Sequence, residues 1–250
     1  MRRLLAILFV LLMCGCTFVE QGDETQPEGL CIVGASFAYP ENGWFEMACE
    51  QLNCTPINKA ISGECIIHTA QRFSDNTQFA EGELDKFRIF VIMHTHNVDV
   101  CNGIRAKKDR LGENPTIAEA YDYVIRRYIS MCRELEFDSS SAWFGVSGGK
   151  PVDIILCTHW HDGRVIFNNS VRRLSEQWRG YVRLCEFDKN IGFTKDRPIT
   201  KSGKQVSTSY AHPGAGATEI IDGVEYGWHP KRGRDSEIQQ RMADIFCKCF

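Results

Sequence analysis

Short apolar runs alternate with longer amphipathic segments along most of the chain. The runs at 31–36, 87–93 and 152–157 are rich in β-branched and other apolar residues, which is typical of buried strands. The segments at 43–52, 114–135, 170–185 and 236–246 carry apolar residues at helical spacing, with Asn114 as the expected N-cap of the second and Pro115 in its first turn. Strands that alternate with helices predict an α/β fold, a three-layer α/β/α sandwich around a mostly parallel sheet.

The segment from Asp188 to Pro230 breaks this pattern. It is long, polar and glycine-bearing. A loop of this length inside a compact domain is usually functional or disordered. Because reactive residues in such folds gather at the carboxyl ends of the strands, we look for chemistry there and in this loop.

The first residues of the chain are typical of an export signal and not of a folded domain. Arg2 and Arg3 precede an apolar run that is too short to span a membrane but suits a secretory signal. The sequence Met13-Cys14-Gly15-Cys16 resembles a bacterial lipobox, which implies that Cys16 carries lipid such as palmitate. We therefore expect a lipoprotein signal peptide at 1–16, a flexible tether at 17–28 and one domain at 29–250. A plain secreted protein is the alternative.

This reading places the protein in the bacterial cell envelope, held to a membrane through the N-terminal lipid only. The formal net charge of −3 and the scattered Lys and Arg residues give no attraction for nucleic acid. Most of the 12 cysteines lie in apolar runs, which predicts buried thiols. The close pairs, Cys49 with Cys54 and Cys247 with Cys249, lack the pattern of a metal site.

Ser36 is the first residue that suggests a reaction. It directly follows one predicted strand and precedes a helix. Such a position exposes a hydroxyl above the sheet, with helix N–H groups nearby. Ser36 is therefore a candidate nucleophile.

Together with Ser36, short segments spread along the chain resemble the conserved blocks of the SGNH (GDSL-like) hydrolases. Their order and spacing fit that family over about residues 31–246. The segments are Gly34-Ala-Ser36, Asn58-Lys-Ala-Ile-Ser-Gly63, Thr95-His-Asn97 and His229-Pro230.

The resemblance implies a flavodoxin-like sandwich and a serine esterase that uses no metal or other cofactor. Ser36 would be the nucleophile and His229 its base. The Ser36 N–H, the Gly63 N–H and the Asn97 side chain would form the oxyanion hole.

The chain also departs from the family pattern. Ala35 stands where the family has Asp, and Thr95 where it has Gly. The position of the family's acid, three residues before the histidine, is Tyr226. Glu225 is our first choice for the group that orients His229, with Asp222 or a backbone carbonyl as alternatives.

Other histidines offer further readings. His212 is a rival base because Pro follows it as well, and His94 and His96 flank the Asn97 turn, where His96 would contact substrate. His159 and His161 could belong to a metal-dependent hydrolase. However, the motif around them places Asp162 one position early for the metallo-β-lactamase pattern, and a full zinc site needs three or four ligands.

For the substrate we expect a short acyl ester, acetyl first, on a carbohydrate. The 188–230 loop offers Tyr226 and Trp228 as faces for a sugar and carries several lysines, which does not suit a lipase. We expect a monomer with a small-molecule or glycan ester as its partner. A non-catalytic glycan-binding lipoprotein, with Trp160 as a further platform, is the alternative.

Overall fold

The computed structural model describes residues 29–40, 43–95, 98–101, 110–160, 164–191, 211–212, 219–221, 224–226 and 229–250, with the backbone alone between 211 and 226. The residues expected to form the signal peptide and tether lie outside this part of the chain. In the part that is described, no helix is both long and apolar enough to cross a membrane.

Five parallel strands form the central sheet in the order β2-β1-β3-β4-β5. They are β1 (Gly29–Gly34), β2 (Thr55–Asn58), β3 (Ile89–Met93), β4 (Ile154–Cys157) and β5 (Val182–Cys185). The runs at 31–36, 87–93 and 152–157 are thus confirmed as strands, while β2 was not predicted because it is short and partly exposed. All five carboxyl ends meet at one edge of the sheet.

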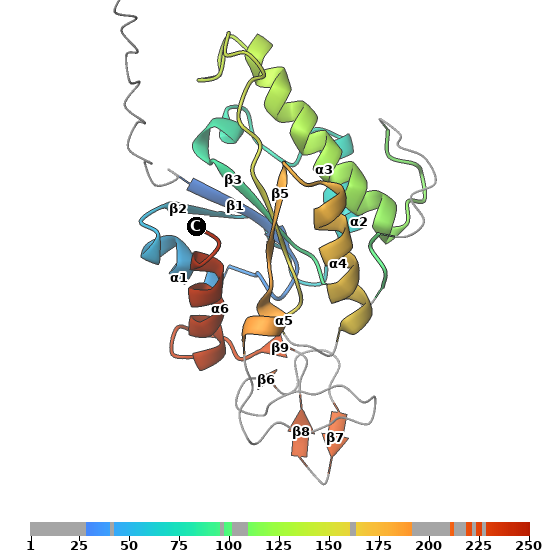
Figure 1. Ribbon diagram of the computed structural model, residues 1–250, viewed down its shortest axis with the longest axis vertical. Coiled ribbons are helices and arrows are strands. Elements are labelled where there is room, and N and C mark those ends of the chain that lie inside the picture. Colours follow the sequence, from blue (N-terminus) through green and yellow to red (C-terminus); the bar gives the residue numbers. More distant parts are fainter. Residues whose placement is uncertain are drawn as a thin grey trace, which may run out of the picture.

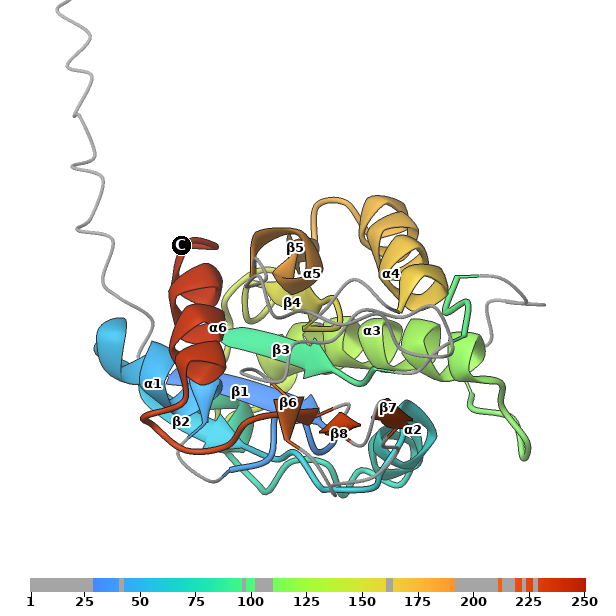
Figure 2. The ribbon, with the colours of Figure 1, turned by 90° about the horizontal axis from the view of Figure 1, so that it is seen from below.

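Helices cover both faces of the sheet, as the three-layer prediction requires (Figure 2). The helices α1 (Trp44–Gln51), α5 (Phe187–Asn190) and α6 (Glu237–Cys247) cover one face, and α2 (Ile66–Ser74), α3 (Ile117–Glu134) and α4 (Val165–Gln177) cover the other. Alternate strand residues point to opposite faces. On β1, Leu30 and Ile32 therefore pack in the first core, and Cys31 and Val33 in the second.

Short elements complete the chain. Two 3-10 turns, Glu83–Lys86 and Leu135–Phe137, precede β3 and follow α3. Two antiparallel pairs lie beyond the carboxyl edge of the sheet (Figure 1): β6 (Ala211–His212) with β9 (His229–Pro230), and β7 (Glu219–Ile221) with β8 (Val224–Tyr226). The polar 188–230 segment therefore contributes backbone structure above the sheet edge.

The helix predicted over 170–185 was wrong at both ends. α4 begins at Val165 and ends at Gln177, and Val182–Cys185 is an edge strand of the sheet. The turn between them contains Gly180 at φ +100°, a conformation that ends a helix and that glycine adopts without strain. Trp178 and Val182 continue the helical spacing of Val171 and Leu174 by coincidence.

The predicted cap of α3 was also wrong by two residues. The N-cap is Thr116, whose hydroxyl accepts a hydrogen bond from the Glu119 N–H at 3.2 Å. The Glu119 carboxylate in turn accepts from the Thr116 N–H at 2.8 Å. This reciprocal capping box satisfies two N–H groups and outweighs the signal of Asn114 and Pro115.

The cysteines in apolar runs are buried thiols, as expected: Cys31, Cys132, Cys157 and Cys185. Burial raises the pKa of the Cys132 thiol to about 11. A thiol that stays protonated at neutral pH is a poor nucleophile. These four cysteines therefore act as core residues.

Candidate active site

Ser36 lies in a tight turn directly after β1. The Ala38 N–H donates to the Ala35 carbonyl at 2.9 Å and closes the turn around the half-buried Ser36. Gly34 ends the strand where a Cβ would meet the Met93 carbonyl at 2.8 Å, so only glycine lets the ends of β1 and β3 approach this closely. The local sequence thus presents the Ser36 hydroxyl at the carboxyl edge of the sheet.

His229 reaches the same point from the other end of the chain. It lies in β9, whose register pairs it with His212 of β6. Its Nε2 lies 2.8 Å from Ser36 Oγ, which is hydrogen-bond distance. With the imidazole neutral and its proton on Nδ1, the Ser36 hydroxyl donates to Nε2. The structure therefore brings together the residues expected as nucleophile and base.

Phe37 is a site residue that sequence reasoning missed. Its ring stacks on the His229 imidazole, with centroids 4.9 Å apart and planes 13° apart. The same ring meets His159 edge to face at 4.7 Å. The Phe37 carbonyl accepts a hydrogen bond from the Trp44 indole at 2.9 Å. The signal available in the sequence was an aromatic residue next to the nucleophile.

One buried amide joins the segment after Ser36 to the segment after His229. Gln239 Oε1 accepts from the Trp44 N–H at 2.9 Å, and Gln239 Nε2 donates to the Lys231 carbonyl at 3.0 Å. Gln239 is on α6 and Trp44 begins α1. This bridge fixes the segments that follow Ser36 and His229 relative to each other, and nothing in the sequence pattern pointed to it.

Asn58, the first residue of the second block, stabilises the turn after Ser36 through its side-chain amide. Its side-chain N–H groups donate to the Ala38 carbonyl at 2.7 Å and to Glu46 at 2.6 Å, and its oxygen accepts from the Ala60 N–H at 2.9 Å. The other Glu46 oxygen accepts from the Gly43 N–H at 3.0 Å. Asn58 therefore links the end of β2 to the loop that carries Ser36.

Of the expected oxyanion groups beyond Ser36, Gly63 is described by the structure and Asn97 is not. Gly63 lies in the turn after β2 with φ +81°, and the Ile61 N–H of this turn donates to the Gly34 carbonyl at 3.1 Å. This bond ties the Gly63 turn to the end of β1. Asn97 and His96 lie outside the described residues, a few positions beyond the end of β3.

The acid that would orient His229 stays a prediction. Asp222 lies outside the described residues, as do Trp228 and the side chains of Glu225 and Tyr226, although the backbone of β8 places Glu225 above the sheet edge. The side chain of the rival base His212 is not described either. Its backbone lies directly beside His229.

His94 and Trp160 are packing residues. His94 is fully buried, where its Nε2 is hydrogen-bonded to the Thr69 hydroxyl at 2.9 Å and its carbonyl accepts from the Tyr121 hydroxyl. Trp160 is fully buried in the core beneath α1 and α6. A buried indole offers no face to a sugar, so the expectation of Trp160 as a glycan platform was wrong.

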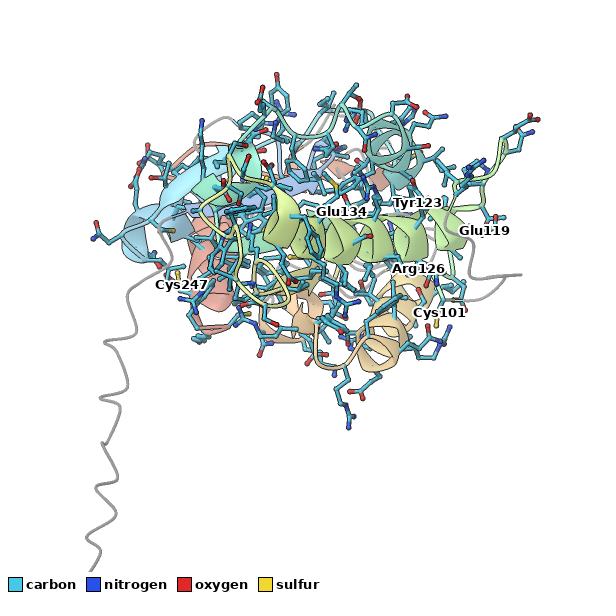
Figure 3. The ribbon with its side chains drawn as sticks, turned by 90° about the horizontal axis from the view of Figure 1, so that it is seen from above. Cys101, Glu119, Tyr123, Arg126, Glu134 and Cys247 are labelled. Atoms are coloured by element: carbon cyan, nitrogen blue, oxygen red, sulfur yellow. The ribbon has the colours of Figure 1, made fainter. Side chains whose placement is uncertain are left out.

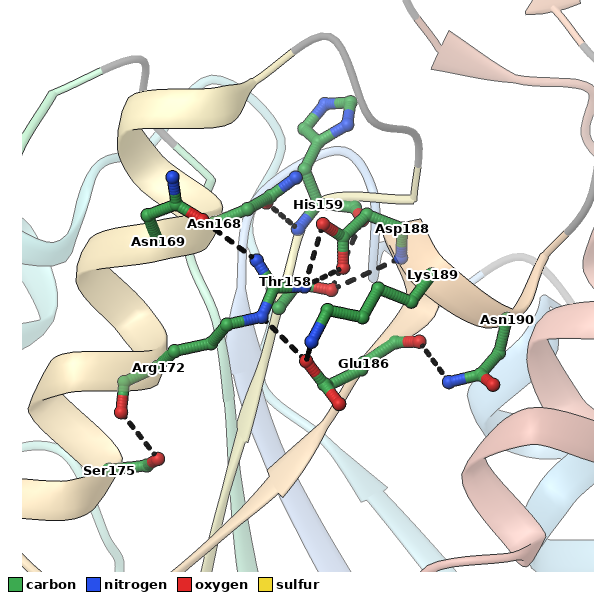
Figure 4. A network of polar contacts seen from close by, with 10 residues as sticks. All are labelled: Thr158, His159, Asn168, Asn169, Arg172, Ser175, Glu186, Asp188, Lys189 and Asn190. Carbon is green, nitrogen blue, oxygen red and sulfur yellow. Dashed lines mark hydrogen bonds and ion pairs between the residues drawn. The ribbon is translucent and has the colours of Figure 1, made fainter.

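The end of β4 carries His159 into a polar network (Figure 4). His159 is fully buried, and its backbone N–H donates to the side-chain oxygen of Asn168 at 2.8 Å. His161 and Asp162 lie outside the described residues. Among the residues that are described, no group of three His, Cys, Asp or Glu side chains is placed to hold a metal ion.

Arg172 on α4 is the centre of that network. It binds both oxygens of Asp188, at 2.6 and 2.8 Å, and Glu186 at 2.5 Å. Burial alone would raise the pKa of Glu186, but hydrogen bonds from Lys189 and Arg172 outweigh it and lower that pKa. Glu186 is therefore ionised at neutral pH, and the network joins α4 to the end of β5.

Several solved structures are similar to this chain. A member of the lipolytic protein G-D-S-L family from Veillonella parvula DSM 2008 is 14% identical with a TM-score of 0.41. The match covers 88% of this chain and 94% of that one. An α/β hydrolase from the metagenome of Lake Arreo, Spain, is 14% identical with a TM-score of 0.47. The match covers 89% of this chain and 94% of that one.

A carbohydrate esterase family 2 enzyme with a carbohydrate-binding domain, from Corynascus thermopiles (Myceliophthora fergusii), is 11% identical with a TM-score of 0.49. The match covers 88% of this chain and 64% of that one.

The comparison with curated proteins found no match. One family model matches residues 29–250, which is nearly the whole chain. The chain therefore belongs to the family described as Domain of unknown function (DUF5040).

Proposed function

We propose that this protein is a serine esterase with Ser36 as nucleophile and His229 as base. The observation that carries the proposal is the 2.8 Å separation between Ser36 Oγ and His229 Nε2. A serine hydroxyl is a weak nucleophile until a base within hydrogen-bond reach activates it. The position of both residues at the carboxyl edge of a parallel sheet, and the SGNH-like blocks in the sequence, support the same reading.

The reaction we propose has two halves. Ser36 Oγ attacks the ester carbonyl carbon while His229 Nε2 takes the hydroxyl proton, and the carbonyl oxygen becomes an oxyanion. The N–H groups of Ser36 and Gly63 and the side chain of Asn97 are the proposed donors to that oxyanion. The leaving alcohol takes the proton from His229 as the acyl-enzyme forms. Water then attacks the acyl-enzyme while His229 takes its proton, and the proton passes to Ser36 Oγ as the bond to the acyl group breaks and the acid leaves.

A small cavity beside Ser36 supports a short acyl group. Its volume is about 20 Å³, and its walls include Ala38, Trp44, Phe45 and Pro230. A space of that size takes about one water molecule, which is close to the size of a methyl group. We therefore propose acetyl esters as substrates, with a carbohydrate as the alcohol because the segment beyond residue 188 is polar.

The proposal is tested with purified protein and p-nitrophenyl acetate. We expect Ser36→Ala to abolish turnover, whereas Ser140→Ala, at an exposed serine away from the site, leaves it unchanged. Treatment with EDTA should have no effect. Loss of activity in EDTA together with an active Ser36→Ala variant would replace the proposal with metal-dependent hydrolysis at His159 and His161. Glycan binding without any turnover would replace it with the non-catalytic reading.

The substrate class needs its own assay. We expect turnover of p-nitrophenyl esters to fall from C2 to C12, and acetate to be released from acetylated xylan or from O-acetylated sialic acid. The physical reason is the small cavity beside Ser36, whose size matches an acetyl group. Highest activity on long chains, with none on the acetylated glycans, would indicate a lipase-like esterase instead.

A further inference from the structure

A second hollow lies along the outer side of α3, on the face of the sheet opposite α1 and α6. Its volume is about 780 Å³. One wall comes from Ser74 and Asn76 at the end of α2, and the other from Trp178 and Tyr181 between α4 and β5. We call this hollow the α3 groove. Its size is that of a site for an extended small ligand rather than for an ion.

Arginines dominate the groove. Arg110, Arg126, Arg127 and Arg133 line it, and no carboxylate does so among the described residues. In Figure 3 Tyr123 and Arg126 mark the middle of α3, and Glu119 and Glu134 its two ends. A hollow lined by several guanidinium groups and no acid attracts anionic ligands.

The arginines are held in place by their neighbours. The guanidinium groups of Arg126 and Arg133 lie over the Trp178 and Tyr181 rings, each 5.9 Å from the ring centroid. Arg133 also donates to the Tyr181 hydroxyl at 2.8 Å, and Arg127 to Asn76 at 3.0 Å. Stacking on a ring orients a guanidinium while its N–H edge stays available to bind a carboxylate.

The charge of the groove is moderate. Arg126 is paired with Asp122, and Arg127 with Glu134 at 2.6 Å. An adjoining hollow toward the start of α3 is lined by Glu113, Glu119 and Asp122, so the cationic stretch is bounded at that end. A densely charged polymer such as nucleic acid would need more unpaired cations, and a flat bilayer would not enter a concave groove.

Aromatic rings, hydroxyl and amide groups and a few cations together match a ligand with many hydroxyl groups and widely spaced carboxylates. We propose that the α3 groove binds a segment of carboxylate-bearing polysaccharide, independently of the Ser36 site. The rings of the wall residues Trp178 and Tyr181 orient the guanidinium groups of Arg126 and Arg133 toward the carboxylates. The side chains of Ser130, Asn76 and Tyr181 supply hydrogen-bonding groups for its hydroxyl groups.

The test is isothermal titration calorimetry of the full chain with oligogalacturonate, and with its methyl-esterified form as the uncharged probe. We expect the wild type to bind the first and to bind the second at least about tenfold more weakly. Arg133→Ala should weaken oligogalacturonate binding about tenfold, because Arg133 is exposed and its loss removes a charged donor. Trp178→Ala should also weaken oligogalacturonate binding, because Arg126 loses the ring that orients it.

Arg179→Ala is the matched control. Its side chain is 80% exposed, it is paired with Glu176, and it does not line the groove although it adjoins Trp178. We expect this variant to bind as the wild type does. Turnover of p-nitrophenyl acetate should be unchanged in Arg133→Ala, which separates this proposal from the esterase proposal. Absence of binding, equal loss in Arg133→Ala and Arg179→Ala, or binding of DNA or phosphatidylglycerol vesicles in place of oligogalacturonate would overturn it.

Discussion

The imidazole of His229 is held from two sides at the residue scale. Ser36 Oγ contacts its Nε2 at 2.8 Å, and the Phe37 ring stacks on its face. Phe37 is itself tied to the start of α1 through the Trp44 indole. Phe37 carries no group that can react, so we assign it a positioning role.

Replacing Phe37 should therefore slow the reaction. We expect Phe37→Ala to lower kcat for p-nitrophenyl acetate about tenfold, which is the upper range for the loss of one aromatic pair. Phe37→Tyr, which keeps the ring, should restore kcat. An unchanged kcat in Phe37→Ala would show that the stack does not position His229.

Lys150 gives a prediction about pH and stability. Its side chain is buried, its ammonium donates to the Leu84 carbonyl at 2.6 Å, and it lies 3.9 Å from the centroid of the Phe87 ring. Loss of hydration lowers the pKa of Lys150 from 10.5 to about 8. Below pH 8 the lysine is charged in both states, so the cost of burying the charge is fully present.

Between pH 8 and 10.5 the folded protein has released this proton while the unfolded chain retains it. The contribution of Lys150 to the free energy of unfolding should therefore rise across this range, by at most about 3 kcal/mol. The measurement is urea denaturation of the wild type and Lys150→Met from pH 7 to 10.5. A difference between the two proteins that does not change with pH would contradict the prediction.

At the scale of elements, the start of α3 depends on its capping box. Thr116→Ala removes the acceptor for the Glu119 N–H and should lower the free energy of unfolding by about 1 kcal/mol. Thr116→Ser keeps the hydroxyl and should retain most of the stability. Denaturant unfolding monitored by circular dichroism measures both. Equal stability of the alanine variant and the wild type would mean that Glu119 alone caps the helix.

At the scale of the whole molecule, the proposed lipid on Cys16 would hold the protein at a membrane. The motivation is the lipobox-like sequence at 13–16. We expect the wild type to fractionate with membranes and Cys16→Ser to be released into the soluble fraction, because a cysteine is needed to accept the lipid. Membrane retention of Cys16→Ser would favour an uncleaved anchor instead.

The sequence predicted the main strands of the fold better than the edge strand and the helix cap. The strands at 31–36, 87–93 and 152–157 were predictable because a strand buried on both faces reads as a continuous apolar run. The strand at Val182–Cys185 was missed because its spacing also fits a helix, and only pairing with β4 distinguishes the two. The cap at Thr116 was missed because two N-terminal signals overlap there and the competition between them depends on geometry.

For the site, the sequence by itself determined which chemical groups are present: a serine after the first strand, a glycine at the end of the Asn58–Gly63 segment and a histidine before the last helix. Only the tertiary structure decided which of them meet. It brought Ser36 within hydrogen-bond distance of a histidine 193 residues away, stacked Phe37 on that histidine, and used Gln239 to join their two segments. Contacts of this kind leave no periodic trace in a single sequence, because they form between segments that the folding of the sheet and helices brings together.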